Sequence, residues 1–96
     1  MKINDPNGEN IIYINERLRN KIDKIDKEMA ILFSQRMELI ELVKEEKKKN
    51  NLPTYNEARE KEIKAKNMLF VNSEYVEEYK EFIESILKIS KEYQEK

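Results

Sequence analysis

The chain has 96 residues, of which 41% are charged, and its 19 Lys and Arg residues nearly balance its 20 Asp and Glu residues. This length corresponds to one small domain, and the near-neutral charge argues against a protein built mainly to bind the phosphate backbone of nucleic acids. The absence of Cys and His excludes disulfide bonds, thiol nucleophiles, imidazole bases and Cys/His metal sites.

The scarcity of turn residues favours an all-α fold, because one Gly and two Pro are too few for the many turns of an all-β protein. No apolar run approaches the ~20 residues of a membrane span, and the N-terminus lacks the apolar segment of a signal peptide. We therefore expect a soluble, cytoplasmic protein. Residues 1–10 are predicted to form a flexible lead-in, and residues 11–96 the single folded domain.

A long first helix is predicted from about Ile12 to Lys49, a span without Gly or Pro that Asn50, Asn51 and Pro53 should end. Its apolar residues follow a heptad pattern with steps of four and three. This row comprises Leu18, Ile22, Ile25, Met29, Leu32, position 36, Leu39 and Val43.

The length of this helix predicts a partner chain. About 38 helical residues extend roughly 57 Å, whereas a compact chain of this size has a radius of gyration of only about 12–13 Å. The apolar row would be exposed to water in a monomer, so we predict a homodimer.

Two shorter helices are expected after the first. One should extend to about Phe70, with Thr54 and Glu57 as a capping box or Asn56 as the N-cap. The other should span about residues 74–93, with Ser73 as its N-cap.

Arg36 interrupts the apolar row, and a buried guanidinium is costly unless an anion pairs with it. Lys47 lies eleven residues later, within about 20° of the same helix face. Arg19 lies about 100° from that face and is better placed to reach a partner chain. Arg36 could instead form an ion pair that fixes the helix register, and Lys47 could be solvated surface.

Four further polar residues extend this set. Arg59 and Glu60 lie in the first turn of the second helix, where free N–H groups favour anions, although both could simply pair with neighbours. Ser90 and Gln94 continue the apolar stripe of the third helix. Together these residues suit a small polyanion with a hydroxyl or ether oxygen.

The chain resembles the AroQ class of all-helical chorismate mutases over about residues 11–95. Residues 18–26 (LRNKIDKID) are similar to the family's LRxxIDxID opening, and residues 52–60 read LPTYNEARE. The ordered spacing R-x16-R-x10-K-x11-R-E, followed by S-x3-Q, is more specific than any single element. The resemblance implies an intertwined homodimer of three-helix chains, with two sites that each use both chains.

The resemblance also implies roles for individual residues. Arg36, Arg59 and Arg19 of the neighbouring chain would hold the two carboxylates of chorismate, assisted by Ser90. Lys47 and Gln94 would hydrogen-bond the ether oxygen, and Glu60 the ring hydroxyl. Asn56 stands where the family commonly has Asp, and a register slip of three residues would put Leu87 and Lys91 in place of Ser90 and Gln94.

The implied reaction is the rearrangement of chorismate to prephenate in phenylalanine and tyrosine biosynthesis. It is pericyclic, so it requires no metal, cofactor, base or nucleophile, and it benefits from orientation and fixed charge. Two alternatives remain: an isochorismate-pyruvate lyase of the same fold, and a non-catalytic helical dimerisation module. We expect no nucleic-acid or membrane partner.

Overall fold

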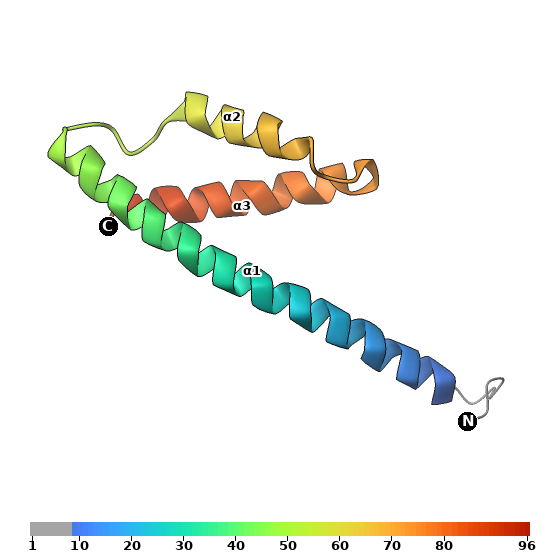
Figure 1. Cartoon of the computed structure of the whole chain (residues 1–96). Coiled ribbons are helices and arrows are strands. Elements are labelled where there is room, and N and C mark those ends of the chain that lie inside the picture. Colours follow the sequence, from blue (N-terminus) through green and yellow to red (C-terminus); the bar gives the residue numbers. More distant parts are fainter. Residues whose placement is uncertain (1–8) are drawn as a thin grey trace. The chain divides into compact units, whose positions relative to one another are not determined.

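The computed structural model describes residues 9–96 and consists of helices and their connections (Figure 1). The elements are α1 (Glu9–Lys49), α2 (Glu57–Met68), the short 3-10 helix η1 (Ser73–Tyr75) and α3 (Val76–Gln94). No strand occurs among the described residues, so the predicted all-α fold of one long, one short and one medium helix is confirmed. Most of the predicted lead-in, residues 1–8, lies outside the described residues, and α1 begins at Glu9 rather than near Ile12.

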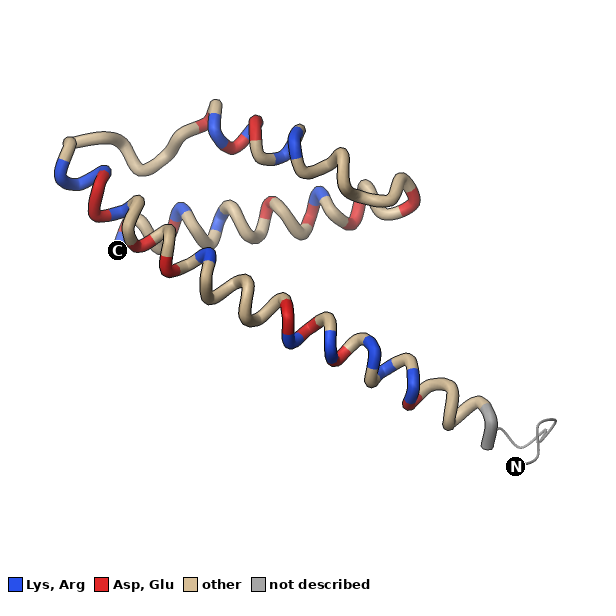
Figure 2. The backbone as a smooth tube through the Cα atoms, viewed as in Figure 1, with Lys and Arg blue, Asp and Glu red and all other residues tan. Residues whose placement is uncertain are grey.

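The chain divides into two compact units, one ending at Arg36 and the other spanning Met37–Lys96. The described part of the first unit consists only of residues 9–36 of helix α1. The second unit holds the end of α1 together with α2, η1 and α3. Acidic and basic residues are interspersed along every long helix (Figure 2), so the high charge content is spread over the surface rather than gathered in one block.

The end of α1 is a Schellman motif, in which two backbone N–H groups turn back to the last helical carbonyls. Leu52 N donates to Lys47 O at 2.8 Å, and Asn51 N donates to Lys48 O at 3.3 Å. Asn51 has φ 55°, in the left-handed region that Asn tolerates better than most residues. The predicted end of the helix is thus confirmed, and the motif fixes the chain direction directly after Lys47.

Helix α2 begins with an asparagine cap. The Asn56 side chain accepts a hydrogen bond from Arg59 N at 3.0 Å, so of the two predicted caps it is Asn56, and not the Thr54–Glu57 box, that starts the helix. Before α3, Asn72 Oδ1 accepts from Glu74 N at 3.2 Å. The predicted cap at Ser73 is therefore wrong: Asn72 caps η1, and α3 starts only at Val76.

The cap at Asn56 gives a stability prediction. Asn56→Ala should lower the free energy of unfolding by about 1 kcal/mol, because an N–H group at the start of α2 loses its acceptor. Asn56→Ser, whose hydroxyl can cap equally well, should stay near the wild-type value. Chemical denaturation at one fixed protein concentration measures both. An equal loss of unfolding free energy in the two variants would contradict the capping role of Asn56.

The inward face of α3 supplies the buried residues of the second unit. Ile83, Leu87 and Ser90 are each only 5% exposed, and they recur at the spacing of one helix face. Helix α3 packs along α2 (Figure 1), and the Lys64–Glu84 ion pair joins the two helices. Among the described residues, no helix combines the length and apolar character that crossing a bilayer requires.

Candidate active site

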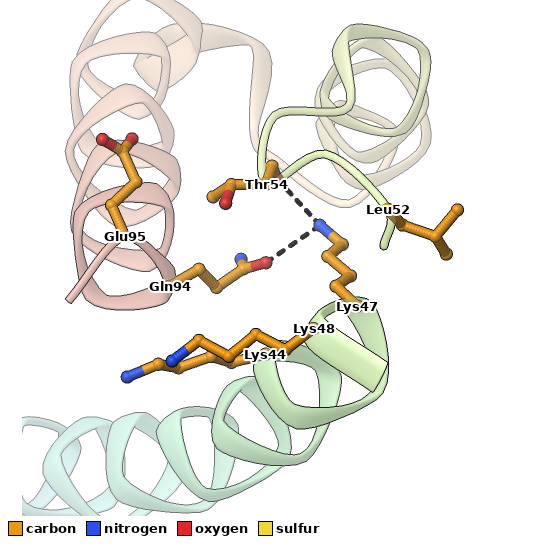
Figure 3. A pocket seen from close by; sticks show the side chains of 7 residues that line it. All are labelled: Lys44, Lys47, Lys48, Leu52, Thr54, Gln94 and Glu95. Atoms are coloured by element: carbon orange, nitrogen blue, oxygen red, sulfur yellow. Dashed lines mark hydrogen bonds between the residues drawn. The ribbon is translucent and has the colours of Figure 1, made fainter. Parts of the chain in front are cut away.

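The end of α1 and the end of α3 enclose a cavity of about 370 Å³ (Figure 3). This size lies within the usual range for small-molecule sites. Three of its lining residues come from the last turns of α1, two from the following connection and two from the end of α3. They are Lys44, Lys47, Lys48, Leu52, Thr54, Gln94 and Glu95.

Lys47 is the centre of this cavity. Its Nζ donates to the Thr54 carbonyl oxygen at 2.7 Å and to Gln94 Oε1 at 2.9 Å (Figure 3). Lys47 and Gln94 are 47 residues apart in sequence, so this contact is a product of the fold. An ammonium group has three donors, and these two bonds leave one N–H for a ligand.

Gln94 and Glu95 form the α3 side of the cavity, and Ser90 lies one turn before Gln94 on the same helix. Gln94 Nε2 donates to Ser90 O at 3.3 Å, and Ser90 Oγ donates to Ile86 O at 2.9 Å. The alternative register, with Leu87 and Lys91 in place of Ser90 and Gln94, suits the cavity less well. Leu87 is an apolar residue of the buried face, and the exposed Lys91 places its Nζ 4.6 Å from the centre of the Tyr55 ring.

The polar residues of α2 do not line the Lys47 cavity. The Arg59 side chain is 58% exposed and forms an ion pair with Glu62 on its own helix. Glu60 is half-buried and lines a second cavity of about 400 Å³ between α2 and α3. Asn56 serves as the helix cap. The structure thus brings Lys47 and Gln94 into contact, whereas Asn56, Arg59 and Glu60 lie at the start of α2 and do not line this cavity.

The sequence profile of the family described as Chorismate mutase type II matches residues 18–95 of the chain. The chain belongs to this family. No curated protein and no solved structure matches it. The protein is therefore an enzyme, a chorismate mutase, which is an isomerase acting on chorismate. The resemblance to the all-helical chorismate mutases is confirmed.

The match to the chorismate mutase family covers all eight residues of the predicted site. Two of them, Arg19 and Arg36, belong to the unit that ends at Arg36. Both lie on α1, where Arg19 is exposed and Arg36 is half-buried.

Some cavity residues of this chorismate mutase were missed by sequence reasoning. Thr54 contacts Lys47 through its backbone carbonyl oxygen. Every residue has such a carbonyl, so the amino-acid type at position 54 does not reveal this contact. Lys44 and Lys48 are separated by one helical turn and flank Lys47, so the i, i+4 spacing could have identified them. Leu52, the first residue of the LPTYNEARE segment, also lines the cavity, as does Glu95, which no motif marks.

Two side chains with raised pKa values, Tyr93 and Lys64, interact with residues of a neighbouring helix. The pKa of Tyr93 is raised above its ordinary value, chiefly by hydrogen bonding to the Glu41 carboxylate and then by burial and by the charges of Glu41 and Glu45. Oε2 of Glu41 is buried and makes no hydrogen bond within the described part of the chain. The pKa of Lys64 is raised, chiefly by its hydrogen bond to Glu84.

Proposed function

We propose that this chorismate mutase converts chorismate to prephenate, at a branch of phenylalanine and tyrosine biosynthesis, by orienting the dianion and stabilising charge at its ether oxygen. The observation that carries the proposal is the contact between Lys47 and Gln94 in a cavity lined by three lysines and one acidic residue. The chemistry needs no proton transfer, which is consistent with a chain that lacks His and Cys.

The proposed transition-state stabilisation comes from two preorganised donors. As the C–O bond of chorismate breaks, negative charge grows on the ether oxygen, and donors already aimed at that oxygen lower the barrier. Lys47 offers its third N–H. Gln94 offers Nε2 once its amide turns from Ser90 O toward the ligand. Because Oε1 is part of the same planar amide, this rotation also exchanges the Oε1 contact with Lys47 for contacts to the ligand.

The proposed carboxylate contacts come from Arg36, from Arg59 and from Arg19 of a second copy of the chain. Arg59 would exchange its exposed pair with Glu62 for a substrate carboxylate. That exchange costs little free energy, since exposed ion pairs contribute little to stability. We assign the ring hydroxyl to Glu60, with Asn56 able to donate or accept nearby, and a supporting contact at a carboxylate to Ser90.

A homodimer with shared sites is part of the proposal. The apolar row on α1 is at least 44% exposed at every aliphatic position from residue 18 to residue 32. Such a continuous apolar stripe is typical of a helix that pairs with another helix. The residues of this stripe are Leu18, Ile22, Ile25, Met29 and Leu32.

The experiment for the proposed function is the loss of chorismate absorbance when purified protein is added, with prephenate identified as the product. Release of pyruvate from isochorismate, without prephenate formation from chorismate, would instead establish the lyase. A non-catalytic module would give neither product and would show no saturable binding of chorismate.

Shared sites predict complementation between two inactive variants. Arg19→Ala and Lys47→Ala each remove a residue from every site of their own homodimers. A mixed dimer, however, has one site with both residues intact and one site with neither. Co-refolding equal amounts should therefore restore about a quarter of the wild-type activity, since random pairing makes half of the dimers mixed.

Mixing the two already folded proteins under conditions that prevent chain exchange is the control and should restore nothing. If the co-refolded mixture is no more active than its separate components, Arg19 does not act across the dimer.

A further inference from the structure

Gln94 is the last residue of α3, a position at which a helix is weakly held. Terminal turns open at little cost in free energy unless side chains fasten them to the rest of the fold. The bond from Lys47 Nζ to Gln94 Oε1, at 2.9 Å, joins this turn to α1, but the proposed function requires the Gln94 amide to exchange that bond for the ligand. Holding the last turn in place while the amide rotates requires another contact.

Tyr93 makes such a contact with α1. The centre of its ring lies 5.2 Å from Nζ of Lys44, a cation–π distance. Its hydroxyl hydrogen-bonds the carboxylate of Glu41, which raises the Tyr93 pKa. Glu41 and Lys44 are three residues apart, so they lie on the same face of α1. One side chain next to Gln94 thus joins the end of α3 to two residues of α1.

Burial marks the face of α1 against which Tyr93 packs. The half-buried residues between Met37 and Lys47 recur at the spacing of one helix face, at positions 37, 40, 41, 44 and 47. At the end of α3, Tyr93 and Gln94 are half-buried, whereas the residues on either side of them are exposed. The end of α3 therefore lies against α1 through these two residues, beside the green part of α1 in Figure 1.

We propose that Tyr93 is a positioning residue for the rearrangement: packed on Glu41 and Lys44, it fixes the last turn of α3 so that the amide of the next residue reaches the ether oxygen of the substrate. The inference rests on the proposed function, which gives Gln94 that task. Tyr93 does not line the Lys47 cavity, so it acts through the backbone. Because the donor matters most when charge grows on the ether oxygen, a looser turn should lower kcat more than it raises KM.

The test compares Tyr93→Leu and Tyr93→Phe in steady-state kinetics with chorismate. Tyr93→Leu removes both the ring and the hydroxyl. It should lower kcat about 10-fold with KM within about 2-fold, since a misplaced catalytic group can cost about 10²-fold in rate. Tyr93→Phe keeps the ring beside Lys44 and should lose less. An unchanged kcat in Tyr93→Leu would overturn the proposal.

A double-mutant cycle with Gln94→Met shows whether Tyr93 acts through Gln94. Once the amide is gone, its position no longer matters, so adding Tyr93→Leu to Gln94→Met should change kcat by less than about 2-fold. A further loss as large as in the wild-type background would mean that the two residues act independently, and it would refute the positioning role.

Tyr79→Leu is the matched control. Tyr79 is also half-buried and also lies on α3, and its ring contacts Phe82 of the same helix, at 5.9 Å between ring centroids. This variant should leave kcat at the wild-type value. An equal fall in kcat in Tyr79→Leu and Tyr93→Leu would overturn the proposal in favour of a general loosening of α3.

Hydrogen exchange separates failure of this inference from failure of the proposed function, because it needs no substrate. Glu95 N donates to Lys91 O at 3.1 Å, and this amide should exchange at least about 10-fold faster in Tyr93→Leu than in the wild type or Tyr79→Leu. Equal exchange in the three proteins would refute the contact, whether or not the wild type converts chorismate. Faster exchange with a wild-type kcat would refute the positioning role alone.

Discussion

Lys47→Ala is expected to lower kcat for chorismate by at least ~10²-fold, the usual cost of removing one preorganised donor from a developing oxyanion. The Lys47 ammonium is held by Thr54 O at 2.7 Å and Gln94 Oε1 at 2.9 Å, so its position is fixed before substrate arrives. No water molecule that replaces it can carry its charge. Steady-state kinetics with chorismate measures the effect.

Because Lys47 also tethers the connection after α1 to α3, its variant needs a structural control. Circular dichroism and sedimentation should show the helix content and the oligomeric state of the wild type, which separates lost chemistry from lost fold. Lys49→Ala removes an exposed lysine from the same run of residues and should leave kcat unchanged. Near-wild-type turnover of a folded Lys47→Ala dimer would refute the role assigned to Lys47.

Gln94→Glu should confine activity to acidic pH. An amide donates a hydrogen bond at any pH, whereas a carboxyl group donates only when it is protonated. A carboxyl at this position would lie beside the Lys47 ammonium, which favours the ionised form and lowers the carboxyl pKa. Activity should therefore be present only below that lowered pKa, which lies under the ordinary Glu value of about 4.3, and disappear as the pH rises through it.

The pH dependence of kcat in the Gln94→Glu variant and the wild type tests this expectation. Gln94→Met, which has similar length but no donor, should be slow at every pH and serves as the control for size. A Gln94→Glu profile that follows the wild-type profile would remove Gln94 from the site.

The local structure was predictable where one residue type decides it. The end of α1 at Asn50 and Asn51 follows from backbone preferences that neighbouring residues hardly alter. The cap at Asn56 was one of two that the sequence left open, beside the Thr54–Glu57 box. The cap of the third helix was misplaced because Asn72 and Ser73 are adjacent and both can cap, and the choice depends on how η1 turns into α3.

The site was predictable as a set of residues but not as a set of contacts. Spacing placed Lys47 within about 20° of the helix face of Arg36, and the family pattern added Gln94. That Gln94 Oε1 accepts from Lys47, and that a backbone carbonyl of Thr54 completes the environment of the ammonium, depends on how the chain turns between α1 and α2. No side chain encodes that carbonyl.

From 96 residues without His or Cys, the sequence by itself determined an all-α fold and the family, because these depend on residue types and their order. Only the tertiary structure decided which charges gather at one cavity and which are neutralised elsewhere. Arg59 pairs with Glu62 on its own helix, whereas Lys44, Lys47 and Lys48 face α3 together. The physical reason is that an electrostatic interaction depends on distance and burial, which are fixed only when α1 and α3 pack.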